Sequence, residues 1–397
     1  MIDVDAAAFL SITIVAALAG LTVAFIGPRM ALPVVVVELL LGIAIGPDVL
    51  GIAEVDQFLL FFSNLGLGML FFFAGYEIDF RRVQGIPLRL AILGWGLSLL
   101  LAYALAGLLA AFAVIASAVY VASAMSTTAI GTLLPILRDA GELKTRFGTL
   151  LLAAGAVGEF GPILVFTLFL STESPLHEAA LLVAFVILAV GIGVMAVRGG
   201  VRGWETLERT LESSSQLAVR LTVVLVFALV GLAAELGLDV LLGGFVAGLI
   251  TRMVIREREV EALESKLTAV GYGFFIPFFF VVSGMQFDLK ALGSAGALVE
   301  MGLYLVLFLV IRGAPALLLY RAELGHLRDR AALGLFSSAQ LPLVVAITTV
   351  ALETGNMGSE TAASLVGAGM LSTLLFPLIG LRLRGDRRHR EPLPEPA

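Results

Sequence analysis

The sequence lacks the residues on which several kinds of chemistry depend. It contains no cysteine, which excludes disulfides, thiol catalysis and cysteine-ligated metal sites. Its three histidines, His177, His326 and His389, lie outside the long apolar runs, and there is no HExxH motif. An intramembrane protease of the zinc or serine type, or a haem or quinone protein, would need histidine within the membrane. We therefore expect neither an enzyme nor a bound cofactor.

Charge is also scarce. Only 14% of the 397 residues are charged, the formal net charge is -6, and no soluble basic segment is present, which argues against a nucleic acid as partner. Hydrophobic residues, by contrast, make up 59% of the chain, and glycine, which lets membrane helices pack closely, occurs 43 times. The composition predicts an all-α polytopic protein whose main surroundings are the lipid bilayer.

Apolar runs separated by polar or Gly/Pro-rich breaks predict thirteen transmembrane helices. The first run follows two aspartates and no basic residue, so we expect a retained helix rather than a cleaved signal peptide. The segments lie near residues 8–26, 32–46, 58–77, 89–110, 112–137, 147–171, 178–197, 216–234, 239–251, 267–284, 295–319, 330–351 and 361–381.

The basic residues test this count. Of the 25, all but Lys290 and Arg312 fall in alternate loops or in the carboxyl tail, while Lys290 lies in the opposite set of loops and Arg312 within a segment. The positive-inside rule then predicts an amino terminus outside and a carboxyl terminus in the cytoplasm, in the inner (plasma) membrane. An odd number of helices follows. The arginine-rich tail after Leu381 is expected to be a positive-inside anchor that can touch anionic lipid.

Three pairs of similar stretches predict an internal repeat. FFFAGYEIDF at 71–80 resembles FFVVSGMQFDL at 279–289, with Gly75 opposite Gly284 and Asp79 opposite Asp288. ELLLG at 38–42 resembles GFVAG at 244–248, and STTAI at 126–130 falls near SSAQLP at 337–342. Helices 1–6 would then match helices 8–13. A shift of seven helices reverses direction, so the repeats are inverted and a substrate site between them is expected at the midplane.

Helices 5 and 12 carry matching interruptions of the apolar pattern. Small polar residues interrupt both, and Pro342 has no N–H to donate to the preceding turn. Broken backbone at this depth is tolerated where it is buried or lines a cavity. The alternative is an intact helix that is kinked by hydroxyls bonding to the preceding turn. The residues concerned are Met125, Ser126, Thr127, Thr128, Ser337, Ser338 and Gln340.

Glu159 is the one ionisable residue between Arg146 and Glu173, and it lies near the middle of that apolar segment. A carboxylate at the bilayer centre costs roughly 2.5 to 3.5 kcal/mol on insertion scales, so such residues usually face a protein interior or a water-filled cavity. A lone carboxylate can bind either a proton or a cation. The alternative is a protonated carboxyl that serves only as a buried hydrogen-bond donor. We predict that Glu159 is the ion and proton site.

The ligands of a transported Na+ or K+ can be predicted from the two interruptions. Glu159 supplies two hard oxygens, and hydroxyls or carbonyls of the helix breaks can complete the shell. Gly158 and Gly161 are expected to leave room for a hydrated ion. The ligands drawn from the breaks are Ser126, Thr127, Thr128, Ser337 and Ser338.

Arg312 is the only basic residue that the prediction places inside the membrane. Its guanidinium stays charged, so it cannot carry a proton, and it is predicted to be a charge partner of the site. The alternatives are that it caps unwound helix ends or reaches an interface. Among the other acids, Glu38 is expected to be structural or to line a scaffold, and Glu77, Asp79 and Asp288 to be solvated or to cap helices. With one titrating carboxylate, exchange of one proton per cation is predicted to be electroneutral.

Five stretches in order resemble signatures of the monovalent cation:proton antiporter-2 family, and the resemblance covers about residues 8–381. The resemblance implies a homodimer of thirteen-helix protomers, with helices 5 and 12 as crossing broken helices. Helix 6 would carry the ion-binding acid, and helix 11 a basic partner, here Arg312. The stretches are ELLLGIAIGPDVLGI (38–52), LGLGMLFFFAGYEIDF (65–80), STTAI (126–130), LGGFVAGLI (242–250) and PFFFVVSGMQFDL (277–289).

In this family a core half moves like an elevator against a scaffold half. Carried over by position, residues 1–83 and 201–290 would form the scaffold, and 84–171 and 291–382 the core. Residues 172–200 would form a linker helix and 383–397 a cytoplasmic tail. The chain departs from the pattern at the centre, because many members have two adjacent acids, or Asn or Gln followed by Asp, where this chain has Gly158 and Glu159.

Two other functions fit the same frame. A cation channel or uncoupled carrier would show a continuous polar ring or a filter repeat, and the sequence has neither. An organic-ion transporter would need aromatic or basic recognition groups inside the segments, which are nearly absent. A small inorganic cation is therefore the favoured substrate.

Overall fold

The computed structural model describes residues 5–30, 33–76, 84–112, 115, 118–169, 181, 183–192, 194–195, 215–236, 240–254 and 260–385, and in these residues there is no β-strand. The helices are α1 (Ala6–Met30), α2 (Val34–Ile45), α3 (Gln57–Tyr76), α5 (Ile86–Ala111), α6 (Ala118–Met125), α7 (Ile130–Asp139), η1 (Glu142–Lys144), α8 (Arg146–Phe169), Val183–Ile192, α10 (Leu217–Glu235), α11 (Val240–Val254), α12 (Val260–Val270), η2 (Gly271–Phe275), α13 (Ile276–Met285), η3 (Lys290–Gly293), α14 (Ala295–Leu319), α15 (Leu327–Ser337), α16 (Pro342–Glu353) and α17 (Ser359–Arg384).

The prediction of thirteen apolar segments is confirmed in the described part of the chain. Among the described residues, eight stretches are long and apolar enough to cross a membrane. One of them, Leu263–Met285, runs through α12, the π-helical turn η2 and α13 without a break in its helical path. Where the structure describes the chain, two segments are interrupted, one between α6 and α7 and the other between α15 and α16. The helix ends differ from the prediction by a few residues, and α17 continues to Arg384.

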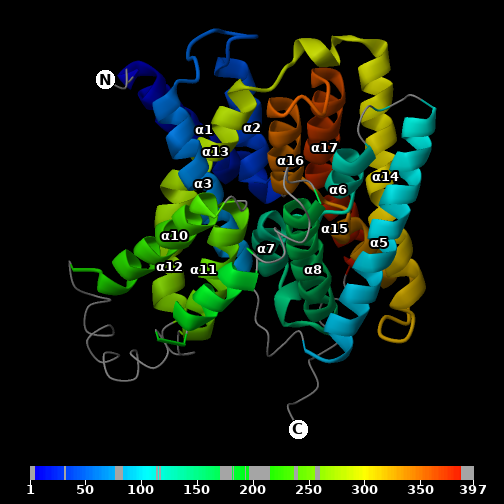
Figure 1. The fold of residues 1–397 in the computed structure, drawn as a ribbon. Coiled ribbons are helices and arrows are strands. Elements are labelled where there is room, and N and C mark those ends of the chain that lie inside the picture. The colour runs from blue at the N-terminus through cyan, green and yellow to red at the C-terminus, as the bar shows by residue number, and fades with distance from the viewer. Residues whose placement is uncertain are drawn as a thin grey trace.

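Figure 1 shows the helices in two groups that lie side by side. The first contains α1 to α3 and α10 to α13, where α3 packs on α11 and α2 on α13. The second contains α5 to α8 and α14 to α17, where α5 packs on α8 and α14 on α17. The groups meet where α3 lies against α7 and α8, and where α2 lies against α17. Each group therefore combines helices from both halves of the sequence.

Glycines at matching places hold the first group together and reveal the repeat. A Cβ atom at Gly42 of α2 would lie 2.3 Å from the carbonyl oxygen of Val281 in α13. At Gly248 of α11 it would lie 2.0 Å from the carbonyl oxygen of Phe72 in α3. Only glycine permits so close an approach of two backbones. Because α2 with α13 mirrors α11 with α3, the two halves of the chain are related as the predicted inverted repeats.

The ends of the helices define two faces. The Asp5 N–H donates to Asp56 Oδ2 at 3.1 Å, so α1 begins beside the loop that precedes α3. Lys290 bonds to Asp48 of the same loop, and Ser294 Oγ donates to Glu360 Oε1 at 2.6 Å, so α17 also begins on this side, which we call the amino-terminal face. α17 ends at Arg384 on the opposite, carboxyl-terminal face (Figure 1). The two ends of the chain therefore lie on opposite faces, as an odd number of membrane crossings requires.

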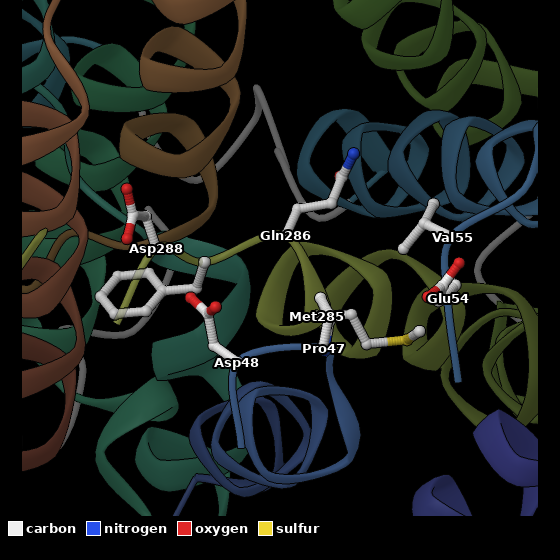
Figure 2. Close-up of a pocket in the computed structure, with 8 residues that line it drawn as sticks. Pro47, Asp48, Glu54, Val55, Met285, Gln286 and Asp288 are labelled. Atoms are coloured by element: carbon white, nitrogen blue, oxygen red, sulfur yellow. The ribbon is translucent and has the colours of Figure 1, made fainter. Parts of the chain in front are cut away.

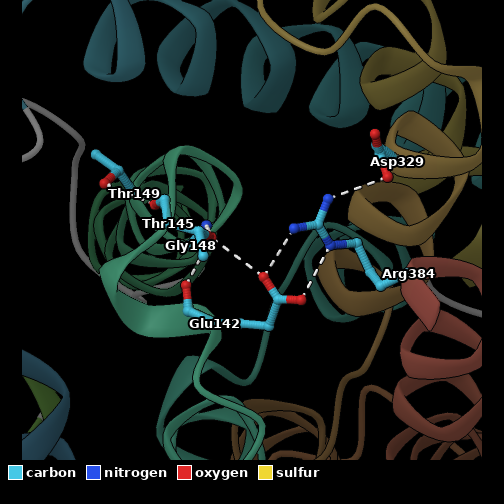
Figure 3. A network of polar contacts seen from close by, with 6 residues as sticks. All are labelled: Glu142, Thr145, Gly148, Thr149, Asp329 and Arg384. Atoms are coloured by element: carbon cyan, nitrogen blue, oxygen red, sulfur yellow. Dashed lines mark hydrogen bonds and ion pairs between the residues drawn. The ribbon is translucent and has the colours of Figure 1, made fainter. Parts of the chain in front are cut away.

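Arg384 is buried on the carboxyl-terminal face, although the sequence groups it with a solvated tail. Figure 3 shows it between two carboxylates, of which Glu142 belongs to η1 and Asp329 to the first turn of α15. Arg384 Nε and Nη2 donate to Glu142 at 3.1 and 2.9 Å, and Nη1 donates to Asp329 at 3.0 Å. The guanidinium also lies 4.3 Å from the centre of the Phe147 ring. This network joins α17 to segments of both repeats.

Candidate functional site

The two interruptions bond directly to each other. The Ala129 N–H donates to the Ala339 carbonyl at 2.8 Å, and Thr128 Oγ1 donates to the Ser337 carbonyl at 2.6 Å. Gln340 Nε2 donates to the Met125 carbonyl at 3.1 Å, so several of the backbone groups freed at one break are satisfied by the other break. The prediction of crossing broken helices is confirmed, and the alternative of two intact, kinked helices is wrong.

Glu159 lies on α8 beside this crossing. Its side chain is only 3% exposed, and its Oε2 atom has no hydrogen-bond partner. Its carboxyl group lies near the backbone of Ile130, the first residue of α7. The neighbouring Gly158 carbonyl accepts from the Thr128 N–H at 3.0 Å. Glu159 therefore lies at the amino end of the half-helix α7, where the helix dipole favours a negative charge.

Arg312 reaches the crossing from α14, and only 4% of it is exposed. Its Nε and Nη2 donate to Thr128 Oγ1 at 3.0 and 2.7 Å, and Nη1 donates to Ser98 Oγ at 3.2 Å. Weaker bonds of 3.3 Å reach the carbonyls of Ala154 and Ser337. No ion pair of Arg312 occurs within the described residues, so it is not in contact with Glu159 in this conformation. A role as charge partner at longer range remains a prediction.

The hydroxyls predicted as ligands make different contacts. Thr128 Oγ1 is fully engaged between Arg312 and the Ser337 carbonyl. Ser126 Oγ and Ser338 Oγ donate to the carbonyls of Ser123 and Gly334, within their own half-helices. Thr127 Oγ1 donates to the Ala124 carbonyl at 3.0 Å and to Gln340 Oε1 at 3.2 Å. Binding of a cation by these groups therefore remains a prediction, and it requires some of these bonds to be exchanged.

Gly158 makes room for the arginine, whereas the sequence suggested room for a hydrated ion. A Cβ atom there would lie 2.4 Å from Arg312 Nη2 and 2.7 Å from Thr128 Oγ1. Gly161 is filled in the same way, because its Cβ would lie 2.5 Å from the Trp95 ring. The guanidinium thus occupies the space of a side chain at position 158. This explains why the residue before Glu159 has no side chain.

We expect Gly158→Ala to lower both stability and transport. The added methyl group must displace the guanidinium from Thr128, and overpacking of this kind typically costs about 1–3 kcal/mol. Gly231→Ala is the matched control, because a Cβ at Gly231 of α10 meets nothing within 4 Å. Thermal unfolding in detergent should show a lower midpoint for Gly158→Ala alone. Equal midpoints for the two variants would contradict the tight contact with Arg312.

Two site residues were missed by the sequence reasoning. Ser98 is fully buried on α5 and accepts from Arg312, and Gln340 joins the two breaks through its side-chain amide. The sequence marks Gln340 only as part of an interruption. Ser98 could have been singled out as a hydroxyl within a long apolar run, but its partner lies far away in the sequence.

A separate hollow of about 340 Å³ lies at the amino-terminal face (Figure 2). Asp48 and Glu54 of one loop and Gln286 and Asp288 of the turn after α13 line it. Asp288 Oδ1 accepts from the Ala291 N–H at 3.0 Å, as expected for a capping acid. The hydrogen bond and charge of Asp48 raise the pKa of Lys290. The described residues contain no group of three or more His, Asp or Glu that could hold a metal ion, here or elsewhere.

Known proteins match this chain along most of its length. Residues 12–381 match the family described as the transmembrane sodium/hydrogen exchanger. The chain is 25% identical over 384 residues to the putative Na+/H+ antiporter YjbQ of Bacillus subtilis, covering 90% of this chain and 61% of that protein. It is 28% identical over 277 residues to the Na+/H+-K+ antiporter GerN of Bacillus cereus, covering 67% of this chain and 68% of the relative.

The fold also has a counterpart among solved structures. The sodium proton antiporter MjNhaP1 of Methanocaldococcus jannaschii superposes with a TM-score of 0.61 over 95% of both chains, at 15% identity. This likeness concerns the arrangement of helices alone. The match over residues 12–381 agrees with two features of the structure, the crossing of two broken helices and the buried acid beside it. The chain belongs to the sodium/hydrogen exchanger family of transmembrane proteins.

Proposed function

We propose that this protein exchanges a monovalent cation, Na+ or K+, for H+ across the membrane. The observation that supports this most strongly is Glu159, a carboxyl group with an unpartnered buried oxygen beside two crossing helix breaks. An unpaired carboxylate in such surroundings costs several kcal/mol, so it needs either a proton or a cation. The two ligands compete for the same oxygens. Exchange follows if the group is open to the two sides of the membrane in turn.

Arg312 would hold the crossing rather than carry a proton. Its guanidinium bonds both breaks through Thr128 and the Ser337 carbonyl, and it keeps its charge throughout. A fixed positive charge near the site would limit the number of cations that bind at once. This supports a stoichiometry of one proton per cation, with the cation held by Glu159 and by oxygens of Thr127, Thr128, Ser126, Ser337 and Ser338.

An elevator cycle fits the two helix groups. Glu159, both breaks and Arg312 belong to the group of α5 to α8 and α14 to α17, which would be the moving core. The group of α1 to α3 and α10 to α13 would be the fixed scaffold and the surface for a homodimer. The charge pattern supports a plasma-membrane protein with its amino terminus outside, so that the amino-terminal face would be the outer one.

The test is dissipation of a pH gradient in proteoliposomes on addition of Na+, K+ or Li+. We expect one or more of these ions to release protons in a saturable way. A continuous current much larger than a carrier permits would indicate a channel instead. Proton release only with organic cations would indicate the other alternative. Neither result would be compatible with the proposed exchange.

The same liposomes test whether exchange is electroneutral. With a single titrating carboxylate, one proton is exchanged for one monovalent cation and no net charge crosses. We therefore expect the rate to be unchanged when a potassium diffusion potential, set with valinomycin, is imposed during Na+ exchange at a fixed pH gradient. A strong response to the potential would mean that a second charge moves in each cycle.

A further inference from the structure

A small cavity lies behind the helix crossing, between α5 and α14. Its volume is about 10 Å³, which is close to the least that holds one water-sized particle. Its polar lining includes Trp95 and Ser98 of α5, Arg312 of α14 and Tyr320, which follows the last residue of α14. Glu159 does not line it, so the cavity is separate from the proposed cation site.

Arg312 brings a positive charge to this cavity, and in the described part of the protein that charge has no opposite partner. The guanidinium bonds only to hydroxyl and carbonyl oxygens. No residue that lines the cavity is acidic. Burying a charge without an opposite one is costly, because neutral groups replace only part of the hydration that the charge loses. A negative ion beside Arg312 would therefore be stabilised.

The groups around the cavity offer hydrogens to such an ion. Trp95 Nε1 is buried and has no hydrogen-bond partner. Arg312 Nη1 carries two hydrogens, of which one donates to Ser98 Oγ at 3.2 Å and the other bonds to no described residue. The Tyr320 hydroxyl is close enough to the guanidinium to interact with it electrostatically, and it can supply a third hydrogen.

Oxygens that could accept from a ligand are already engaged. Ser98 Oγ accepts from Arg312, and its own hydrogen goes to the Gly94 carbonyl at 3.0 Å. The carbonyls of Ala154 and Ser337, which also line the cavity, accept from Arg312 at 3.3 Å. A water molecule has two hydrogens to donate, whereas an anion only accepts. The lining therefore favours an anion over water.

The donors are held in place, and the space is small. A Cβ atom at Gly161 would lie 2.5 Å from the Trp95 ring, so the indole packs directly on α8 and its N–H has a fixed direction. The volume excludes polyatomic anions such as phosphate or a carboxylate ligand. A chloride ion, which is only slightly larger than a water molecule, matches both the size and the donor set.

We propose that a chloride ion binds between Trp95 Nε1 and Arg312 Nη1 as the buried counter-ion of Arg312. It joins α5 to α14 within the proposed core and leaves Nε and Nη2 of the guanidinium on Thr128. The ion is a resident ligand and is not transported. This inference does not depend on the proposed exchange, since binding and stability can be measured without a gradient.

The first test is thermal unfolding in detergent while sodium chloride replaces sodium gluconate, so that Na+ and ionic strength stay constant. Gluconate is too large for the cavity. A ligand that binds only the folded protein stabilises it logarithmically with concentration. We expect the unfolding midpoint of the native protein to rise by about 2 °C for each tenfold increase in chloride above its dissociation constant.

Two variants decide whether this rise comes from the cavity. Trp95→Phe removes the N–H donor but keeps an aromatic ring against Gly161, and Tyr320→Phe removes a hydroxyl with little change in shape. Both should lose most of the rise, and the second serves if the first fails to fold. Tyr103→Phe is the matched control, because Tyr103 of α5 pairs with Ser123 Oγ outside the cavity, and it should keep the full rise.

The second test is a crystal of the protein grown in bromide, whose anomalous scattering distinguishes it from water. We expect an anomalous peak within hydrogen-bond distance of Trp95 Nε1 and Arg312 Nη1. Equal midpoints in chloride and gluconate would overturn the proposal, because water would then suffice. An equal rise in the native protein and in both cavity variants would also overturn it, since chloride would be acting elsewhere. Failure of cation exchange in liposomes would count against the proposed function and leave these outcomes unchanged.

Discussion

In proteoliposomes, Glu159→Gln should reduce cation-driven proton release to the level of protein-free vesicles. Glutamine has nearly the same shape as glutamate but neither binds a proton in this pH range nor supplies a charged oxygen to Na+ or K+. Both ligands of the exchange are therefore lost together. The variant should fold normally, because the native carboxyl already has an oxygen without a partner. Thermal unfolding alongside the transport assay would separate a loss of function from a loss of structure.

Two further variants make this result specific. Glu159→Asp keeps the charge but is one methylene shorter, so we expect some activity with a changed apparent cation affinity. Glu54→Gln removes an exposed acid of the loop before α3 and should exchange like the native protein. Should Glu159→Gln exchange as fast as the native protein, the ion site would have to lie elsewhere.

The segment count and the crossing could be predicted from the sequence because the bilayer imposes strong constraints. A helix that crosses lipid needs a long apolar run, and backbone can leave the helix at that depth only with partners inside the protein. Pro342 indicates such an interruption in helix 12, and the hydroxyls around Thr128 indicate one in helix 5. Their matching positions predicted that the two breaks belong together, and the bond between Ala129 and Ala339 fits that expectation.

The partners of the buried charges could not be predicted in the same way. Hydropathy shows that Arg312 lies in the membrane, but its contacts with Ser98 and Thr128 join α14 to α5 and to the break between α6 and α7. In the sequence Gly158 indicates free space, because a sequence does not reveal which side chain fills the gap beside a glycine. Arg384 looked like one of several tail arginines. Its burial depends on two acids that are far away along the chain.

This last difference leads to the second large expected effect, which concerns stability. Arg384→Gln should destabilise the protein by about 3–5 kcal/mol, the usual cost of removing one partner from a buried ion pair. The change leaves Glu142, which is fully buried, and Asp329, which is 3% exposed, as two carboxylates without a counter-charge. It also removes the guanidinium from the Phe147 ring. The midpoint of thermal unfolding in detergent measures the loss.

The neighbouring Arg382 provides the control, because it is exposed at the end of the same helix and carries the same charge. If the arginines of this end act only through their charge toward the lipid surface, Arg382→Gln and Arg384→Gln should have equal and small effects. If the network of Figure 3 ties α17 to η1 and α15, only Arg384→Gln lowers the midpoint, and adding Glu142→Gln recovers part of the loss. That recovery is expected because an uncompensated buried carboxylate, rather than a missing contact, accounts for most of the cost.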